Sequence, residues 1–343
     1  MPLVTVEENP YNAETPLADL NRGITPTDLF FVRSHFDVPT LDPASYRLTL
    51  DGDGPSPMGF SLRDLKAFPP REVTVTLECA GNGRTRLDPP VPGVRWAYGA
   101  AGTARFAGTS LSCLLDRAGA GGGAVEVLFV GADRGEVEPG RVVSFQRSLP
   151  LPVARHPDTI LAWEMNGEPL TRLHGSPLRL VVPRWYAVAS VKWLTHVRLL
   201  REPFRGHYQD EKYVYEKEAG TPDGTPVTTL RARAIIASPG DGEHLPHGAL
   251  RVAGMAWSGV APVQCVEVSV DGGRTWQEAT LGAPLSEHAW TPWQRPWSPS
   301  SPGDYLLMAR ATDAAGHTQP LESSWNAQGY GNNVVQQVRV KVD

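Results

Sequence analysis

A lone cysteine lies at the end of a stretch that alternates like a β-strand. In residues 73–84 (VTVTLECAGNGR), valine and leucine alternate with threonine and glutamate as far as Glu78, which is the pattern of a half-buried strand. Cys79 comes next, on a turn rich in glycine and asparagine that lets the backbone approach a ligand closely. Arg84 adds a cation, which lowers the pKa of a nearby thiol. Such a thiolate could bind a soft metal, although a lone cysteine after a strand is more often a small buried hydrophobic residue.

An arginine and a histidine stand two residues apart in the aromatic run at 30–36 (FFVRSHF). In an extended segment, Arg33 and His35 would share one face. That face could line a site, but an edge strand with two solvated polar residues explains the same pattern.

Size and composition describe a soluble protein of two domains. The chain has 343 residues, which is enough for two hydrophobic cores, and its 41% hydrophobic and 20% charged content is ordinary. A net charge of −5 argues against a nucleic-acid partner. The N-terminus has no signal-peptide pattern and no stretch reaches transmembrane length, so we expect no membrane partner and a cytoplasmic location. Three widely spaced cysteines without a CxxC pair argue against a disulfide framework or a zinc site.

Short strands and short helices should carry the polar residues. Residues 1–30, with four prolines, should be loop-like. The strand at 125–130 should end at 131–135 (GADRG), which places Asp133 just beyond it. The glycine-rich tract 118–123 lacks the spacing of a nucleotide-binding loop. Further strands are predicted at 46–51 and 159–165, and helices at 61–68 and 109–118.

The pattern changes beyond a linker at 219–228 (AGTPDGTPVT). Short strands are predicted at 251–257, 264–270, 305–312 and 334–342, separated by turn signals. This pattern indicates an antiparallel sandwich of the immunoglobulin type.

These segments resemble the sulfite oxidase family of molybdopterin-dependent oxidoreductases, in its haem-free bacterial form. LECAGNGR is similar to the molybdenum-cysteine loop of the family, FFVRSHFDVP to its cofactor-binding signature, and VEVSVDGGRTW to its C-terminal domain. Further segments match in the same order over nearly the whole chain. The resemblance implies an α+β molybdopterin-binding catalytic domain at 1–225, followed by an all-β immunoglobulin-like domain at 226–343 that forms a two-fold homodimer.

The resemblance also implies roles for individual residues. Cys79 would hold molybdenum as a thiolate, and Arg33 and Arg84 would hold a small oxyanion substrate. Trp96 would form a wall of the pocket, although a core position explains it equally well. Tyr213 would lie beside the metal, with Tyr208 and Tyr215 as close rivals. Molybdopterin needs cations for its phosphate and hydrogen-bonding groups for its ring edges, and the matching set is Phe31, Val32, Arg33, Ser34, His35, Cys79, Asp133, His174, Arg179, Ser190, Val191 and Lys192.

One position departs from the family pattern. The family ends in a W-N-x-R-G motif whose arginine helps to hold sulfite, whereas residues 325–329 here read WNAQG and place Gln328 there. A charge-assisted hydrogen bond contributes about 1.5–3 kcal/mol, against about 1 kcal/mol for a neutral one. Sulfite binding should therefore weaken by roughly tenfold or more if nothing compensates. Plant nitrate reductases of the superfamily also lack an arginine at this position.

Three functions remain open on the sequence. The first is oxidation of sulfite to sulfate by a molybdenum–molybdopterin cofactor. Because the sequence shows no haem domain, electrons would pass to a separate acceptor: a cytochrome, a quinone-linked protein or O2. The second is a reductase of nitrate or of an S- or N-oxide on the same cofactor, which Gln328 favours. The third is a non-catalytic binding protein with a lectin- or adhesin-like sandwich, which leaves the ordered set of polar residues unexplained.

Overall fold

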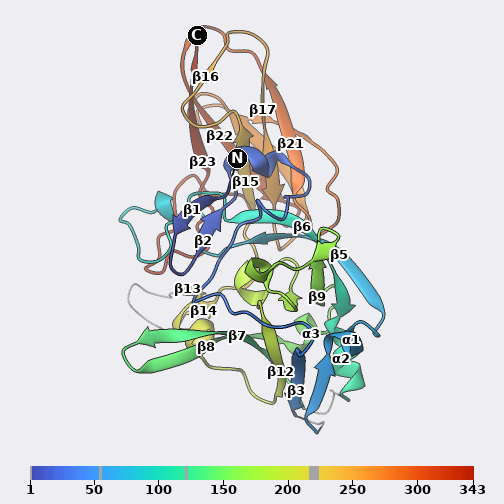
Figure 1. Ribbon diagram of the computed structural model, residues 1–343. Helices are drawn as coiled ribbons and strands as arrows, with labels where there is room; N and C mark the ends of the chain where they lie inside the picture. The colour runs from blue at the N-terminus through green and yellow to red at the C-terminus, as the bar shows by residue number, and fades with distance from the viewer. Residues whose placement is uncertain (1, 54–55, 120–122, 216–223) are drawn as a thin grey trace.

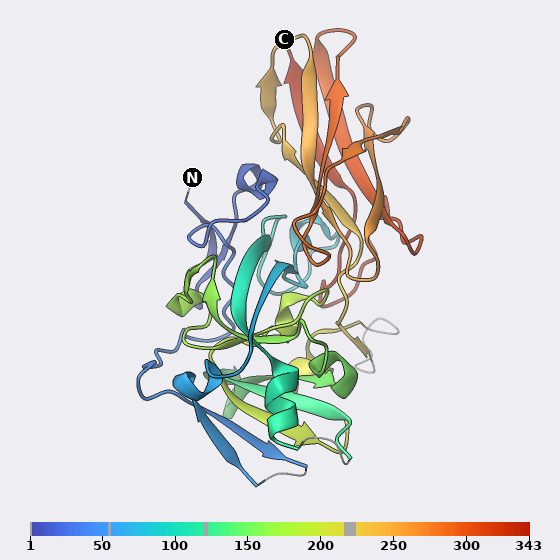
Figure 2. The same cartoon turned by 90° about the vertical axis from the view of Figure 1, so that its right-hand side faces the viewer.

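A computed structural model describes residues 2–53, 56–119, 123–215 and 224–343. The chain forms two bodies stacked along one axis, and the C-terminus lies at the far end of the second (Figures 1 and 2). The glycine-rich tract at 118–123 and the predicted linker at 219–228 fall partly outside the described residues.

Two five-stranded sheets build the first body. One has the order β10-β9-β6-β5 with β11 also paired to β9, and the other has the order β4-β3-β12-β7-β8. The described pairs are antiparallel except for β12 with β3. The first sheet contains β5 (Pro70–Glu78), β6 (Ala101–Ser110), β9 (Ile160–Met165), β10 (Glu168–Pro169) and β11 (Arg179–Val181). The second contains β3 (Arg47–Gly52), β4 (Met58–Ser61), β7 (Glu126–Glu138), β8 (Arg141–Pro150) and β12 (Leu194–Leu200).

Strand β7 runs further than the sequence predicted. It pairs with β8 on both sides of an irregularity between Val130 and Arg134. The segment 131–135 is therefore a bulged continuation of the strand and not a loop. A bulge redirects side chains locally, and Asp133 is carried on this part of the strand.

Helices are few and short in the first body. The α-helices are α1 (Leu62–Leu65), α2 (Leu111–Arg117) and α3 (Leu151–Ala154). Helix α1 begins with a capping box in which Ser61 and Asp64 bond each other's backbone N–H groups, and it is shorter than the predicted 61–68. The short turns are the 3-10 helices η1 (Leu17–Asn21), η2 (Arg84–Arg86), η3 (Arg172–His174) and η4 (Ala187–Ala189), and the π-helix η5 (His207–Glu211).

The prediction that residues 1–30 are loop-like was wrong in part. They contain the antiparallel strands β1 (Val4–Glu7) and β2 (Asn12–Glu14). Ala13 of β2 exchanges backbone hydrogen bonds of 3.0 and 2.8 Å with Val32. Two prolines flank these short strands without interrupting them, since Pro10 lies in the turn and Pro16 follows β2. The hairpin therefore supports the segment that carries Arg33 and His35.

The second body is the predicted all-β sandwich. Its sheets have the orders β15-β17-β21-β20 and β16-β23-β22-β18-β19, and the core between them includes Val252, Trp293 and Val338. Only β16 with β23 is parallel among the described pairs of these two sheets. The small pair β13 (Val214–Tyr215) and β14 (Thr225–Pro226) precedes it. The sandwich strands are β15 (Arg233–Ser238), β16 (Glu243–Leu245), β17 (Leu250–Trp257), β18 (Val263–Ser269), β19 (Gln277–Glu278), β20 (Thr280–Leu281), β21 (Thr291–Trp297), β22 (Gly303–Asp313) and β23 (Gln336–Val342).

A segment of the second body lies against β5. The Ser286 hydroxyl donates to the Thr74 carbonyl at 2.6 Å, and the Thr76 N–H donates to the His288 carbonyl at 2.9 Å. The Trp290 N–H donates to the Thr76 hydroxyl at 2.7 Å. Polar backbone groups at a sheet edge need partners, and here the other body provides them.

Candidate active site

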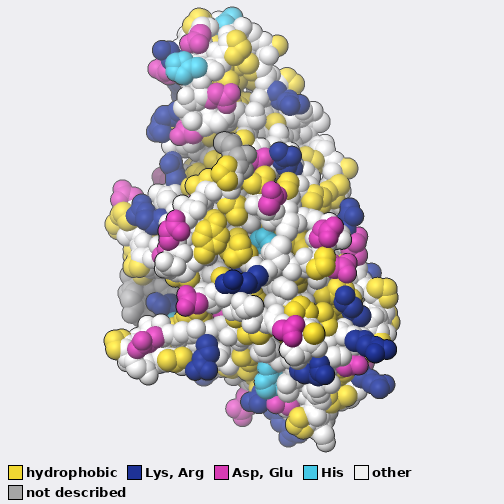
Figure 3. Space-filling view, viewed as in Figure 1, with side chains coloured by type: hydrophobic (Ala, Val, Ile, Leu, Met, Phe, Trp, Pro, Cys, Tyr) yellow, Lys and Arg dark blue, Asp and Glu magenta, His cyan; other side chains and the backbone are white. Residues whose placement is uncertain are grey.

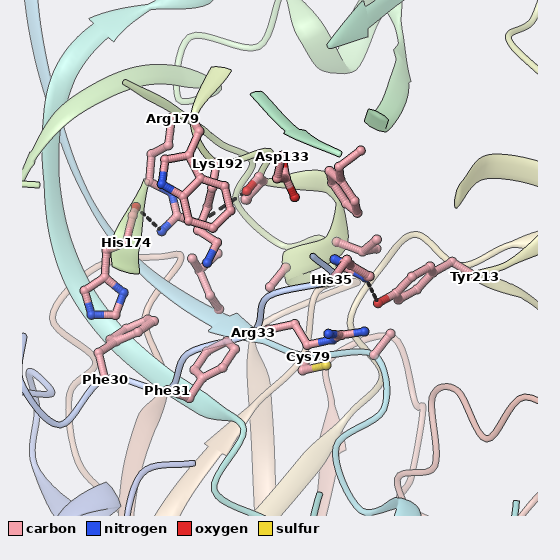
Figure 4. Close-up of a pocket in the computed structure, with 17 residues that line it drawn as sticks. Phe30, Phe31, Arg33, His35, Cys79, Asp133, His174, Arg179, Lys192 and Tyr213 are labelled. Carbon is pink, nitrogen blue, oxygen red and sulfur yellow. Dashed lines mark hydrogen bonds between the residues drawn. The ribbon is translucent and has the colours of Figure 1, made fainter. Parts of the chain in front are cut away.

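Cys79 follows β5 directly and lies where two cavities meet. It is 5% exposed, and its sulfur faces the Arg33 guanidinium in Figure 4. Both cavities are lined by Cys79, Arg33, His35 and Tyr213. Burial raises the pKa of the thiol, and Arg33, the Gly81 N–H and Arg84 offset this only in part. The expectation that a neighbouring arginine makes Cys79 a thiolate is therefore corrected for the protein without a metal, because desolvation is the larger effect.

The first cavity is lined on one side by buried cations. The Arg179 guanidinium donates to the carbonyls of His174 at 3.1 Å and Ser190 at 3.3 Å, and no carboxylate pairs with it among the described residues. Burial lowers the pKa of Arg179 to about 10. His174 donates from Nε2 to the Thr27 carbonyl at 3.0 Å, and burial lowers its pKa to about 3, so the imidazole is neutral. Figure 4 shows these side chains on one wall.

Lys192 and Asp133 line the same cavity. The Lys192 ammonium donates to the Leu173 carbonyl at 2.9 Å and lies 4.1 Å from the centre of the Trp193 ring. Burial lowers the pKa of Lys192 and raises that of Asp133. The Oδ1 atom of Asp133 is buried without a hydrogen-bond partner. An unpaired buried carboxylate oxygen is costly, so this position is suited to a ligand that brings a donor.

The second cavity, of about 280 Å³, lies between the two bodies. Its first-body wall includes Arg84, His207 and Lys212, and its second-body wall includes Gln328 and Tyr330. Basic side chains therefore face this cavity although the whole chain is acidic, with a net charge of −5. On the molecular face in Figure 3, by contrast, charged side chains of both signs are interspersed.

Tyr213 and His35 form a hydrogen bond where the cavities join. The phenolic oxygen lies 2.7 Å from Nε2 of His35. Burial, followed by the charges of Arg33 and Lys192, lowers the pKa of His35 well below its usual range. The imidazole is therefore neutral, and its Nε2 shares one hydrogen bond with the Tyr213 hydroxyl. Tyr213 also stacks on Tyr330, with ring centres 4.5 Å apart.

Arg84 and Gln328 contact each other across the two bodies. Arg84 donates to the Val94 carbonyl at 2.8 Å and to the Gln328 carbonyl at 3.0 Å, and its guanidinium lies 5.3 Å from the Tyr330 ring centre. The Gln328 amide donates to the Glu211 carbonyl at 3.1 Å. Its Oε1 atom is buried and has no hydrogen-bond partner.

Four residues of the predicted set do not line either cavity. Val32 and Val191 are 1% and 0% exposed and take part in backbone pairing. Ser34 is 1% exposed, and Trp96 is fully buried in the apolar cluster that contains Cys79. Ser190 does line the first cavity, but its hydroxyl already accepts the Val182 N–H at 3.0 Å. Phe31 lines the first cavity as expected.

Several lining residues were missed by the sequence analysis as site residues. Phe145 stacks on His35 with ring centres 4.5 Å apart, and Lys212 and Tyr330 line the second cavity. Tyr330 could have been identified from the sequence, because it lies two positions after Gln328. Phe145 had none, because an aromatic residue in a strand is most simply read as core.

The donor set of the first cavity fits an anionic, ring-containing cofactor. Buried Arg179 and Lys192 without paired carboxylates suit a phosphate, whereas Asp133 Oδ1 suits a ring N–H. Cys79 lines the same cavity, and its sulfur is of the type that binds soft metals.

Comparison with known proteins defines the class. Residues 35–208 match the oxidoreductase molybdopterin binding domain, and residues 225–343 match the Mo-co oxidoreductase dimerisation domain. The protein is therefore a molybdopterin-dependent oxidoreductase with an attached domain of the dimerisation type.

The relatives identify the family within this class. Mitochondrial sulfite oxidase of Mus musculus is 37% identical over 98% of this chain and 65% of its own length. The NADH nitrate reductase of Ulva prolifera is 30% identical over 97% of this chain and 42% of its own length. The sulfane dehydrogenase SoxCD from Paracoccus pantotrophus has a similar structure, with a TM-score of 0.81 and 29% identity over 95% of this chain and 83% of that one. The chain belongs to the sulfite oxidase family, and it spans about two thirds (65%) of the length of the mouse relative.

No helix in the described parts of the chain has the length and apolar character needed to cross a membrane. The cytoplasmic location stays a prediction.

Proposed function

We propose that this protein oxidises sulfite to sulfate at molybdopterin-bound molybdenum and passes the electrons to a separate acceptor. The observation that carries the proposal is the place of Cys79, which lies between a cavity with buried cations and a second cavity with basic walls. When bound, the cofactor supplies two-electron oxygen-atom transfer, in which sulfite and water give sulfate, two protons and two electrons. The acceptor is a cytochrome, a quinone-linked protein or O2.

The residues of this chain would hold the cofactor and position the substrate. Cys79 would ligate the metal, while Arg179 and Lys192 would bind the phosphate of the pterin. Asp133 and His174 would meet its ring edges. In this role the cofactor phosphate would give Arg179 and Lys192 a close negative partner, since neither forms a salt bridge within the described part of the chain.

Substrate binding would use the second cavity. Arg33 reaches both cavities, and Arg84 and Lys212 add positive charge to its walls. Tyr213 keeps its proton on the phenolic oxygen because burial raises its pKa. The neutral His35 is hydrogen-bonded to that hydroxyl, so the phenol that lines the cavities with Cys79 would be a fixed dipole that needs no reorganisation during the reaction.

A reductase of nitrate, or of an S- or N-oxide, is the alternative. The amide of Gln328 already donates to Glu211, and its free Oε1 is an acceptor. A neutral side chain at this position brings no positive charge for sulfite, and this is the feature that favours a different substrate. Assays with sulfite and an electron acceptor, compared with nitrate or a sulfoxide and a reductant, separate the two directions.

Three further features of the protein are part of the proposal. The chain forms a homodimer through its second domain, the domain boundary lies at 225/226, and the molybdenum centre works without haem in this chain. Light scattering of the purified protein tests the dimer, because a monomer at assay concentration contradicts it.

The first test of the proposal is metal analysis. Protein purified from cells that make the cofactor should contain roughly one molybdenum and one pterin per chain. Cys79→Ser should lose nearly all activity while Cys113→Ser, at a helix position away from both cavities, keeps it. Full activity of Cys79→Ser would contradict the assignment.

A further inference from the structure

The residue before Cys79 is held by the second domain. Glu78 ends β5 and is fully buried, with 0% exposure. Its Oε1 atom lies 2.8 Å from Nε of Arg233, the first residue of β15, whose side chain is 2% exposed. A buried ion pair between two domains, one residue from the proposed metal ligand, is expensive to desolvate, so its position calls for a specific role.

Both oxygens of the Glu78 carboxylate have partners. Oε1 also accepts the Asn82 amide N–H at 3.0 Å, and Oε2 accepts the indole N–H of Trp257 at 2.9 Å. Trp257 is the last residue of β17, in the second domain. Glu78 is thus fixed by two second-domain side chains and by one residue of its own loop.

The loop that follows Cys79 is bonded to the same domain. The Gly331 N–H donates to the Ala80 carbonyl at 2.8 Å, and the Asn332 amide donates to the Gly83 carbonyl at 2.9 Å. Arg233 donates to the Asn82 carbonyl at 3.3 Å. Gly83 has a φ of 83°, and a Cβ there would lie 3.1 Å from the Asn332 carbonyl oxygen. The second domain is therefore in close contact with the loop backbone.

Without these contacts the loop would be poorly defined. Its internal backbone hydrogen bonds include those from Asn82 to Cys79 and from Arg84 to Gly81. The carbonyls of Ala80, Asn82 and Gly83 would each lose a second-domain donor. Glycine-rich backbone with unsatisfied carbonyls samples many conformations.

We propose that the second domain positions the cysteine loop, and that Arg233 and Trp257 are positioning residues for Cys79. Both act through Glu78, Arg233 also through the Asn82 carbonyl, and neither is among the residues that line the two cavities. The proposal rests on the proposed function only in taking Cys79 as the metal ligand. It gives a domain of the dimerisation class a second role, which is to complete the geometry of the site in its own chain.

The test measures the reactivity of Cys79 in cofactor-free protein. Full-length protein from cells that cannot make the pterin is treated with iodoacetamide, and alkylation of each cysteine is followed by peptide mass spectrometry. Trp257→Phe removes one hydrogen bond to Glu78 and keeps an aromatic ring, whereas Arg233→Met removes the cation. We expect Cys79 to react roughly threefold faster in Trp257→Phe and roughly tenfold faster in Arg233→Met, because local opening governs the reaction of a buried group.

The controls separate positioning from unfolding. His288→Gln breaks a different buried pair between the domains, with Asp158 at 2.9 Å, and should leave the Cys79 rate within about twofold of the parent. Cys113 and Cys265 are only partly buried and report on the whole fold in the same sample. Unchanged Cys79 rates in both variants overturn the proposal, as does an equal rise at all three cysteines.

A measurement on the cofactor-loaded protein distinguishes failure of the positioning role from failure of the proposed function. In molybdenum-loaded Trp257→Phe, the thiolate-to-metal absorption should shift or weaken while the pterin content stays unchanged, because Trp257 is not among the residues that line the first cavity. An unaltered spectrum overturns the positioning role. Loss of the proposed function would show instead as full metal content and activity in Cys79→Ser.

Discussion

At the scale of single residues, Gln328 places a neutral side chain in the wall of the second cavity, beside the basic side chains of Arg84 and Lys212. Its backbone carbonyl binds Arg84, its amide binds Glu211, and its Oε1 atom has no partner. The side chain therefore brings no positive charge to the cavity wall, whereas the family motif that residues 325–329 resemble has an arginine. The consequence is a weaker hold on an anion, which a single substitution can test.

Gln328→Arg should improve sulfite oxidation mainly through KM. Replacing a neutral hydrogen bond by a charge-assisted one gains about 1 kcal/mol, which is about fivefold in kcat/KM. Gln328→Met, of similar length but without polar atoms, is the matched control and should not improve KM. Steady-state kinetics with sulfite would contradict this account if the arginine and methionine variants behaved alike.

His174 should make the cofactor-free protein sensitive to acid. Burial lowers the pKa of His174 to about 3 in the folded state, against about 6.5 in an unfolded chain. A lowered folded pKa means that stability is present above pH 6.5 and is lost as the pH falls toward 3. At pH 5 the loss is about 2 kcal/mol. Urea unfolding at pH 7 and pH 5 should show a smaller difference for His174→Gln than for the parent, and equal differences would refute the assignment.

The sequence predicted residue types at this scale better than their surroundings. Cys79, Arg33 and His35 do meet, because the alternation of β5 and the spacing of two residues fix which side they face. The raised pKa of Cys79 could not be predicted, since it depends on burial by residues far away in the chain. Trp96 and Ser34 carry family motifs but point into packed interior, and a motif does not state the direction of a side chain.

At the scale of elements, the π-helix η5 links the wall of the second cavity to the core. Its Tyr208 carbonyl accepts a hydrogen bond from Arg147, which also donates to the Val227 carbonyl at 3.1 Å. Arg147 lies on β8 and is 0% exposed. Val227 in turn donates its N–H to the Tyr213 carbonyl at 2.7 Å. One buried cation therefore joins the elements on either side of Tyr213.

Arg147→Met should destabilise the protein by about 2–4 kcal/mol. Two charge-assisted hydrogen bonds are lost and two buried carbonyls are left unpaired, while removal of a desolvated cation offsets part of the cost. Arg141→Met is the control, because Arg141 is on the same strand and pairs with Glu211 of the same helix, but at the exposed surface. Exposed pairs contribute little, so its urea midpoint should barely move. An equal shift in both variants would contradict the role given to Arg147.

Elements were predictable where one pattern dominated. The alternation in β3 and β5 predicted those strands, and the leucine spacing predicted α2. The bulge in β7 was not predictable, because glycine and aspartate at 131–135 indicate a turn locally while pairing with β8 continues the strand. The hairpin β1–β2 was hidden by nearby prolines, and its bridge to Val32 depends on a distant segment.

At the scale of the whole molecule, the sequence predicted two domains but not their dependence on each other. The sequence pattern shows where a part with strands and helices gives way to a part with strands alone. It carries no information on contacts between the two parts. The structure places Gln328 and Tyr330 of the second body in the wall of a cavity whose other wall is the first body. It also places residues 286–290 along β5. The proposed substrate cavity is thus lined by residues of both domains.

This sharing predicts that the two domains unfold together. The Glu78–Arg233 pair is 0% and 2% exposed, and breaking a buried pair by removing one partner costs about 3–5 kcal/mol. Calorimetry of the parent should show a single transition, and Arg233→Met should split it into two, because each domain keeps its own core. Arg310→Met is the control: its pair with Glu267 lies within the second domain and is 26% and 30% exposed, so one transition should remain. Two separate transitions in the parent would show that the interface is too weak to couple the domains, since a coupling of several kcal/mol would keep either domain from unfolding alone.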